Sequence, residues 1–218
     1  MIIIECILTL YIREILIPVK VGEVVARFTG DFENFDVANS NSNESNDMSP
    51  SSDPEDVALF WVNRACAQLN QEIAREYMTA LNGDTDVQID PDEPCPVVPS
   101  LEELSDMCDG CSLFGLLAFY CPTQLDWHEI CLKQDISIAD SIYNLQRVQY
   151  FTSDHFPSDV CFLTLEDFLY LPEPLVPNFL AFIADLLFMF EIQPIDSVMP
   201  PYLRLYPDGY TDEYHQSM

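Results

Sequence analysis

The feature that most constrains this sequence is the apolar run NFLAFIADLLFMFE at residues 178–191. Asp185 is its only charged residue before Glu191. A helix that is apolar nearly all the way round has no face suited to water, so it belongs at the centre of a domain. The run is shorter than the roughly 20 apolar residues that a membrane-spanning helix needs. It therefore predicts a core helix around which other helices pack.

Amphipathic segments upstream of this run can supply the surrounding helices. The first follows Asp53, which suits an N-cap position, and extends to about Leu81 with apolar residues at three- and four-residue steps. Another short helix is expected after Gly110, ending before Pro122. Three more segments open on a serine or threonine followed three residues on by an acidic residue, which is the spacing of helix capping: Ser100 and Glu103, Ser137 and Asp140, Thr164 and Asp167. These signals predict an all-α fold.

Large apolar side chains on these helices are expected to anchor the core: Trp61, Leu113, Leu117, Ile142, Leu145, Phe182 and Leu186. Each falls on the apolar stripe of its helix, and aromatic residues at helical spacing fill a core more often than they form a ligand platform. The function expected of these residues is therefore structural. Together with the capped helices they predict a compact helical bundle with disordered acidic and polar flanks.

Composition divides the chain into a domain and its flanks. The helical domain is expected over residues 57–199, with an acidic, proline-rich connector at 82–99 inside it. Residues 38–56 form an Asn/Ser-rich tract that cannot offset its ordering entropy by apolar burial, which predicts a disordered linker. The tail, residues 200–218, contains prolines and tyrosines and is expected to be loose.

The sequence leaves the role of residues 1–37 open. The first part is apolar, but Glu5, Arg13 and Glu14 interrupt it, which argues against a membrane span. A signal peptide needs positive charge ahead of its apolar stretch and small residues at a cleavage site, and neither is present. We interpret the segment as a docking strand or helix, or as an artefact of gene prediction, with a secretory role as the less favoured alternative.

Net charge excludes several classes of ligand. The chain has 37 acidic and 8 basic residues, which gives a formal net charge of −29. Nucleic acid and anionic membrane surfaces repel such a protein, and its lysines and arginines are spread singly. Actin filaments and tubulin tails are also acidic, so direct electrostatic binding to filaments is disfavoured. We expect protein partners, without nucleic acid or membrane.

Cysteines and histidines do not predict a metal or redox site. Cys108 and Cys111 have the spacing of half a zinc site, but a zinc site needs a second pair or a histidine partner. His128, His155 and His215 each stand alone in the sequence. The eight cysteines are therefore interpreted as buried or capping thiols of a chain in a reducing, cytoplasmic location. No metal and no cofactor are expected.

The sequence contains none of the catalytic motifs considered below. The chain has no G-x-S-x-G nucleophile elbow, and its six glycines are not grouped into a phosphate-binding loop. The aspartates between Asp84 and Asp92 suggest calcium ligation, but Ile89 and Cys95 stand where an EF-hand loop needs glycine and glutamate. The sequence therefore predicts a protein that is not an enzyme.

Six sequence blocks carry a resemblance to a known family. In order they are ALFWVNR, SDMCDGCSL, FYCP, ICLK, SIADSIYNLQ and CFLTLEDFLYLP. Over residues 58–199 the chain resembles the N-terminal calponin-homology domain of the CAMSAP/Patronin/Nezha proteins, the calmodulin-regulated spectrin-associated proteins. That family places a tryptophan on its first main helix, here Trp61. The resemblance implies a calponin-homology fold and a non-catalytic adaptor role in a cytoplasmic, cytoskeletal protein that organises microtubule minus ends.

The resemblance also implies contacts with microtubules, spectrin and calmodulin, which the family makes outside this domain. No heptad repeat or second globular domain is present, so we expect a fragment, a truncated gene model or a short isoform without the microtubule-gripping domain. The alternative function is direct binding to actin or microtubules. Actin-binding calponin-homology domains generally work as tandem pairs, and those of end-binding proteins present basic surfaces. This chain has one copy and is acidic, so we favour the adaptor role.

Overall fold

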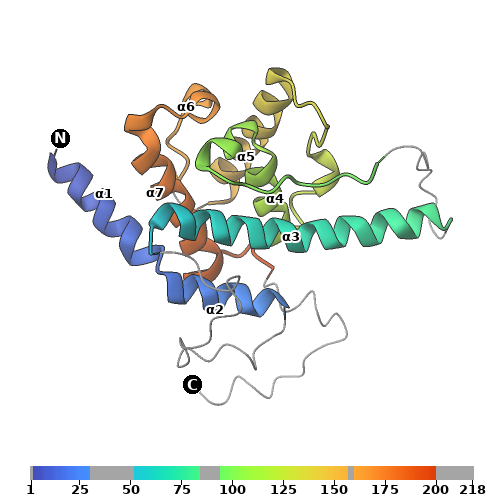
Figure 1. Cartoon of the computed structure of the whole chain (residues 1–218), viewed down its shortest axis with the longest axis horizontal. Helices are drawn as coiled ribbons and strands as arrows, with labels where there is room; N and C mark the ends of the chain where they lie inside the picture. Colours follow the sequence, from blue (N-terminus) through green and yellow to red (C-terminus); the bar gives the residue numbers. More distant parts are fainter. Residues whose placement is uncertain (1, 30–51, 84–93, 157–159, 200–218) are drawn as a thin grey trace, which may run out of the picture.

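A central apolar helix organises the fold (Figure 1). The computed structural model describes residues 2–29, 52–83, 94–156 and 160–199. Helix α7 (Val176–Leu187) occupies the position predicted from the apolar run, and α1 and α3 pack against it. Every regular element in the described part of the chain is helical, which confirms the predicted all-α fold. Much of the predicted flexible sequence lies outside the described residues: 38–51, 84–93 and 200–218.

The helix built on α7 is longer than the sequence predicted. The 3₁₀ helix η3 (Glu173–Leu175) leads into α7, and the π-helix η4 (Phe188–Ile192) continues it. The continuous stretch has 20 residues with a mean hydropathy of 1.8, so by length and composition alone it could cross a membrane. The expectation that it is too short was therefore wrong, because Pro174 and Pro177 lie in opening turns, where proline is compatible with a helix. Its packing in the bundle is that of a core helix.

Helix α3 (Pro54–Leu81) is the longest of the described helices, and it begins directly after Asp53, as predicted. The Asp53 side chain accepts a hydrogen bond from the Glu55 backbone N–H at 3.0 Å, and Pro54 occupies the first turn. The last three residues of the predicted linker at 38–56 are therefore helical. The buried face of α3 ends at Ile73, and the turns beyond it project from the bundle (Figure 1).

Capping at the next helix differs from the prediction. The 3₁₀ helix η1 (Leu104–Asp109) has its capping box at Glu103 and Asp106, three residues later than the expected pair Ser100 and Glu103. The Asp106 carboxylate accepts hydrogen bonds from the backbone N–H groups of Glu102 and Glu103, at 2.7 and 2.9 Å. Ser100 instead lies in an extended segment ahead of the helix.

Helix α4 (Cys111–Tyr120) is buried along its whole length between α3 and α5. Gly110 precedes it with φ 75°, a left-handed conformation that favours glycine. A Cβ atom at this position would lie 2.8 Å from the Asn144 Cβ atom, so a side chain would also collide with α5. The helix ends before Pro122, as predicted.

Two later helices begin where the capping spacing predicted them. In α5 (Ile138–His155), Ser137 and Asp140 form a capping box, and in α6 (Leu165–Tyr170) Thr164 and Asp167 do the same. Helix α5 packs against both α4 and α6. These three elements form the upper layer in Figure 1.

An extended segment is held along α3 by two asparagine side chains. The Asn70 amide donates to the Val98 carbonyl at 2.9 Å and accepts from the Val98 N–H at 2.8 Å. Asn63 makes the same pair of bonds with Leu101, at 2.9 and 2.8 Å. Gly115 of α4 allows this close approach, because a Cβ atom there would lie 3.3 Å from the Val98 methyl carbons. We call this arrangement the asparagine clasp.

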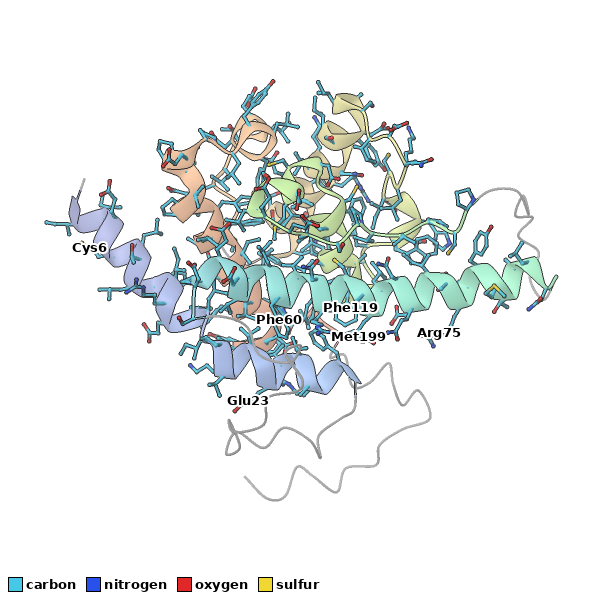
Figure 2. The ribbon with its side chains drawn as sticks, viewed as in Figure 1. Cys6, Glu23, Phe60, Arg75, Phe119 and Met199 are labelled. Carbon is cyan, nitrogen blue, oxygen red and sulfur yellow. The ribbon has the colours of Figure 1, made fainter. Side chains whose placement is uncertain are left out.

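The N-terminal segment of open role forms two helices that dock on the bundle. Helix α1 (Ile2–Ile15) packs against α7, and α2 (Pro18–Thr29) packs against α3. The Phe28 ring lies 5.3 Å from the Phe119 ring, centroid to centroid, where α2 meets α4 (Figure 2). Residues 2–29 thus have the form of docked helices, one of the forms that the sequence left open. The packed body therefore extends beyond the domain expected at residues 57–199.

Candidate functional site

The predicted core anchors are brought together around α4 and α7, with one exception. The fully buried ones are Trp61, Leu113, Leu117, Leu145, Phe182 and Leu186. Ile142 is only half-buried and is not part of the core cluster, so its prediction was wrong. Helix α5 instead turns Asn144 and Val148 inward with Leu145. Because Asn144 is polar, the spacing of apolar residues along α5 did not identify its buried face.

Beside these anchors lies a buried polar network that joins four elements. The Trp61 indole N–H donates to the Tyr120 hydroxyl at 3.0 Å, and that hydroxyl donates to the Glu191 carboxylate at 2.6 Å. The Arg27 guanidinium donates to the other Glu191 oxygen at 2.8 Å. Tyr120 also stacks on Phe190, with ring centroids 4.5 Å apart. The network therefore links α2, α3, α4 and η4.

Electrostatics in this network indicate a structural role. Burial raises the pKa of the Glu191 carboxyl, while the Tyr120 hydrogen bond and the Arg27 charge act against the shift. Burial likewise raises the pKa of Tyr120 well above its ordinary value, and the Glu191 charge adds to the shift. A buried carboxylate is tolerated when it is paired and hydrogen-bonded, as here. The carboxylate therefore serves as the acceptor that joins Tyr120 and Arg27.

A second, half-buried carboxylate holds α1 in place. The Tyr11 hydroxyl donates to Asp185, the charged residue within the apolar run. Burial raises the pKa of Asp185, and the Tyr11 hydrogen bond opposes that shift. Ile12 of α1 and Leu16, the residue after its end, are buried in the core. Sequence reasoning missed both carboxylate sites, although an acidic residue inside an apolar run was itself a signal that a partner must exist.

The thiols of Cys108 and Cys111, which have the spacing of half a zinc site, are not activated. The Cys111 thiol donates to the Cys131 carbonyl at 3.5 Å and accepts from the Asn144 amide at 3.3 Å. Burial raises the pKa of Cys111, and it raises that of Cys108 to about 11. Metal-binding and redox cysteines require the opposite shift, because the thiolate is the reactive species. The described residues contain no group of three side chains suited to hold a metal.

Histidines occupy separate surface positions. The His128 ring lies 2.7 Å from the Asp126 carboxylate and stacks on Trp127 at a centroid distance of 3.7 Å. His155 stacks on Phe151 at the end of α5, with centroids 4.4 Å apart. His215 lies outside the described residues. The two described histidine rings therefore lie apart, and neither forms a pair with an activated cysteine.

A concave groove lies between η1, α5 and α6. Its volume is about 830 Å³. One wall is acidic and the other is apolar, and the side chains that define them are Glu102, Glu103, Asp106, Asp109, Ile138 and Leu169. No described lysine or arginine lines the groove. We call it the acidic groove, and its chemistry suits a basic segment that carries an apolar side chain.

The fold and the site together define a class of protein. A tryptophan-anchored first main helix, a Gly110 break before a buried leucine-rich helix and a central apolar helix are features of a calponin-homology module. Residues 91–172 match the family model described as the CAMSAP CH domain. The chain belongs to the CAMSAP/Patronin family of calponin-homology domain proteins, which confirms the resemblance seen in its sequence blocks.

Several curated relatives support this membership. Calmodulin-regulated spectrin-associated protein 1 of Xenopus laevis is 37% identical over 150 residues, which cover 64% of this chain and 9% of that protein. Calmodulin-regulated spectrin-associated protein 3 of Homo sapiens is 35% identical over 170 residues, or 72% of this chain and 13% of that protein. Patronin of Drosophila melanogaster is 28% identical over 200 residues, which cover 91% of this chain and 11% of that protein.

The chain thus spans only about a tenth of the length of these relatives. No solved structure matches it.

Proposed function

We propose that this chain is a non-catalytic adaptor domain of a cytoplasmic, cytoskeletal protein that organises microtubule minus ends. The observation that carries the proposal is the match of residues 91–172 to the CAMSAP CH domain. Relatives named for association with spectrin and regulation by calmodulin suggest a cytoskeletal setting. The polar side chains described above form helix caps and the Trp61–Tyr120–Glu191 network, so they stabilise the fold. This use is more typical of a recognition domain than of an enzyme.

The acidic groove is the face that we assign to partner binding. Its open volume and its one-sided charge favour a basic protein segment over a filament with an acidic surface. Glu102 is exposed at this groove, and its carboxylate has no hydrogen-bond partner among the described residues. It can therefore be changed without removing a helix cap, unlike Asp106.

Affinity capture from a cytoskeletal extract, with the full chain as bait, tests the proposal. The partner retained by the wild type should be weakened at least about tenfold by Glu102→Lys, because a like charge would face a basic segment. Glu23→Lys makes the same charge change on α2 and should leave capture unchanged (Figure 2). Equal loss in both variants would contradict the assignment of the groove.

Direct filament binding is the competing function, and co-sedimentation separates the two. The full chain should remain in the supernatant with bare microtubules and with actin filaments near physiological salt, because both surfaces are acidic. Robust pelleting that weakens as salt rises would replace the adaptor proposal with direct filament binding.

A further inference from the structure

The outer face of α1 is apolar and uncovered. Its aliphatic side chains are between 62% and 75% exposed: Ile3, Ile4, Ile7 and Leu10. The opposite face of the same helix is buried against α7, so α1 is apolar on two sides. Single exposed apolar side chains are ordinary, but a contiguous group on one element marks an interaction surface.

This outer face is held in place by the rest of the fold. The Tyr11 hydroxyl is bonded to Asp185, and Ile12, Ile15 and Leu16 are buried in the core. The helix projects beyond the bundle, and Cys6 lies on its projecting half (Figure 2). Because α1 is already docked through its inner face, it cannot turn to hide the outer one. A partner would meet a preformed helix.

Charge favours contact between two copies at this end of the molecule. The described N-terminal helices carry equal numbers of acidic and basic residues: Glu5, Glu14, Glu23, Arg13, Lys20 and Arg27. The whole chain, in contrast, has a net charge of −29. The acidic excess lies outside these two helices, so contact between other parts of two copies is on average more repulsive. The exposed apolar face of α1 therefore lies in the part of the molecule where two copies repel each other least.

We propose that the chain self-associates through this face, with α1 of two copies antiparallel across a two-fold axis. Ile3, Ile7, Leu10 and Glu14 follow one another at steps of four, three and four, which places them on one stripe of the helix. An axis between residues 8 and 9 sets Ile7 of each copy against Leu10 of the other. The proposal goes beyond the adaptor function and does not depend on it.

Glu14 selects the antiparallel arrangement. It is exposed at the C-terminal end of the stripe, so the axis places it beside the first turn of the second copy's α1. The positive end of a helix dipole favours a carboxylate there. A parallel arrangement would instead set the two Glu14 carboxylates against each other.

Concentration-dependent sedimentation of the full chain tests the proposal. The face is smaller than a standard interface, so we expect a reversible dimer with a dissociation constant on the order of tens of micromolar. Ile7→Lys should weaken it at least ~100-fold, because the two-fold axis repeats the change in both copies. Met78→Lys, at a 56% exposed methionine of α3, is the matched control and should leave the dimer unchanged.

Two measurements complete the test. Glu14→Gln should weaken the dimer a few-fold at low salt, because the attraction to the second helix is lost. Tighter association of this variant would overturn the antiparallel arrangement.

A chain that is monomeric at several hundred micromolar would overturn self-association. So would a monomer that floats with phosphatidylcholine vesicles and loses this binding on Ile7→Lys, because the face would then belong to a membrane. Unchanged circular dichroism must show that the variants are folded.

Discussion

Helices α4 and α5 are neighbours in sequence and in space, yet they are stabilised in different ways. All ten residues of α4 are buried, the helix contains no charged residue, and the residue before it is a glycine that provides no side-chain cap. Helix α5 has a complete capping box at Ser137 and Asp140 and buries one face only. The one local cap of α4 is the hydrogen bond from the Cys111 N–H to the Asp109 carboxylate at 2.8 Å, so α4 depends mainly on tertiary packing, whereas α5 has a reciprocal capping box. Substitutions should therefore be far more damaging in α4.

Truncating a buried side chain in α4 should have the largest effect. Phe114→Ala removes a fully buried ring, and we expect a loss of ~3–5 kcal/mol in the free energy of unfolding. The α5 counterpart is Tyr150→Ala at a 65% exposed ring, which should cost well under about 1 kcal/mol. Chemical denaturation of both variants measures the contrast, and similar losses would refute the proposed division.

Backbone geometry at the start of α4 should give the next largest effect. Gly110→Ala combines an unfavourable positive φ with a collision against Asn144, so we expect a loss of about 2–4 kcal/mol. Gly83→Ala is the matched control, because Gly83 has φ 78° but open space around it. It should lose only about 1 kcal/mol. The difference between the two melting curves isolates the close approach of α4 and α5.

Removing one hydroxyl at the end of α4 tests the polar network. Tyr120→Phe deprives both the Trp61 indole and the Glu191 carboxylate of a partner, and leaving buried polar groups unpaired costs about 1–3 kcal/mol. Tyr170→Phe changes a 77% exposed tyrosine on α6 and should be neutral within about 0.5 kcal/mol. If Tyr120→Phe is equally neutral in thermal unfolding, the network does not stabilise the fold.

Loss of the N-cap side chain should measurably lower the stability of α5. Ser137→Ala removes an acceptor for the Asp140 backbone N–H, and we expect a loss of about 1 kcal/mol. Ser153→Ala, an exposed serine in the last turn of the same helix, serves as the control and should change stability little. A cap substitution that costs more than Phe114→Ala would reverse the comparison.

The smallest effect should appear as a difference in pH dependence. Because the pKa of Glu191 is raised by burial in the folded state, the unfolded chain releases this proton first as pH rises. Its contribution to stability is therefore present at low pH and is lost as pH rises through the folded-state pKa. Glu191→Gln lacks this loss, so its stability relative to wild type should improve from about pH 4 to pH 7. A relative decline would contradict the assigned direction.

Local signals in the sequence predicted the elements well. The capping spacing at Ser137 and at Thr164 depends only on neighbouring residues, and the structure shows both boxes. The apolar run around Asp185 also determined which helix is central. At Ile142 the prediction failed, because the rotation of α5 is set by packing of Asn144 beside α4. Periodicity alone counts a buried asparagine as a surface residue.

The polar network could not be predicted from any local pattern. Arg27, Trp61, Tyr120 and Glu191 lie far apart in the chain and meet only after folding. Glu191 lies in the π-helix at 188–192. In this helix the Gln193 N–H donates to the Phe188 carbonyl, five residues earlier, at 2.7 Å. Such a widened turn has no reliable sequence signature, because tertiary contacts stabilise it.

The asparagine clasp bears on how this chain avoids unwanted β-sheet growth. An extended segment usually presents a row of N–H and C=O groups that another strand can pair with. Here Asn63 and Asn70 already occupy the N–H and C=O groups of Val98 and Leu101, and their side chains belong to a helix that offers no further edge. Prolines at 94, 96 and 99 have no N–H to donate. The segment is therefore extended without being a template for aggregation.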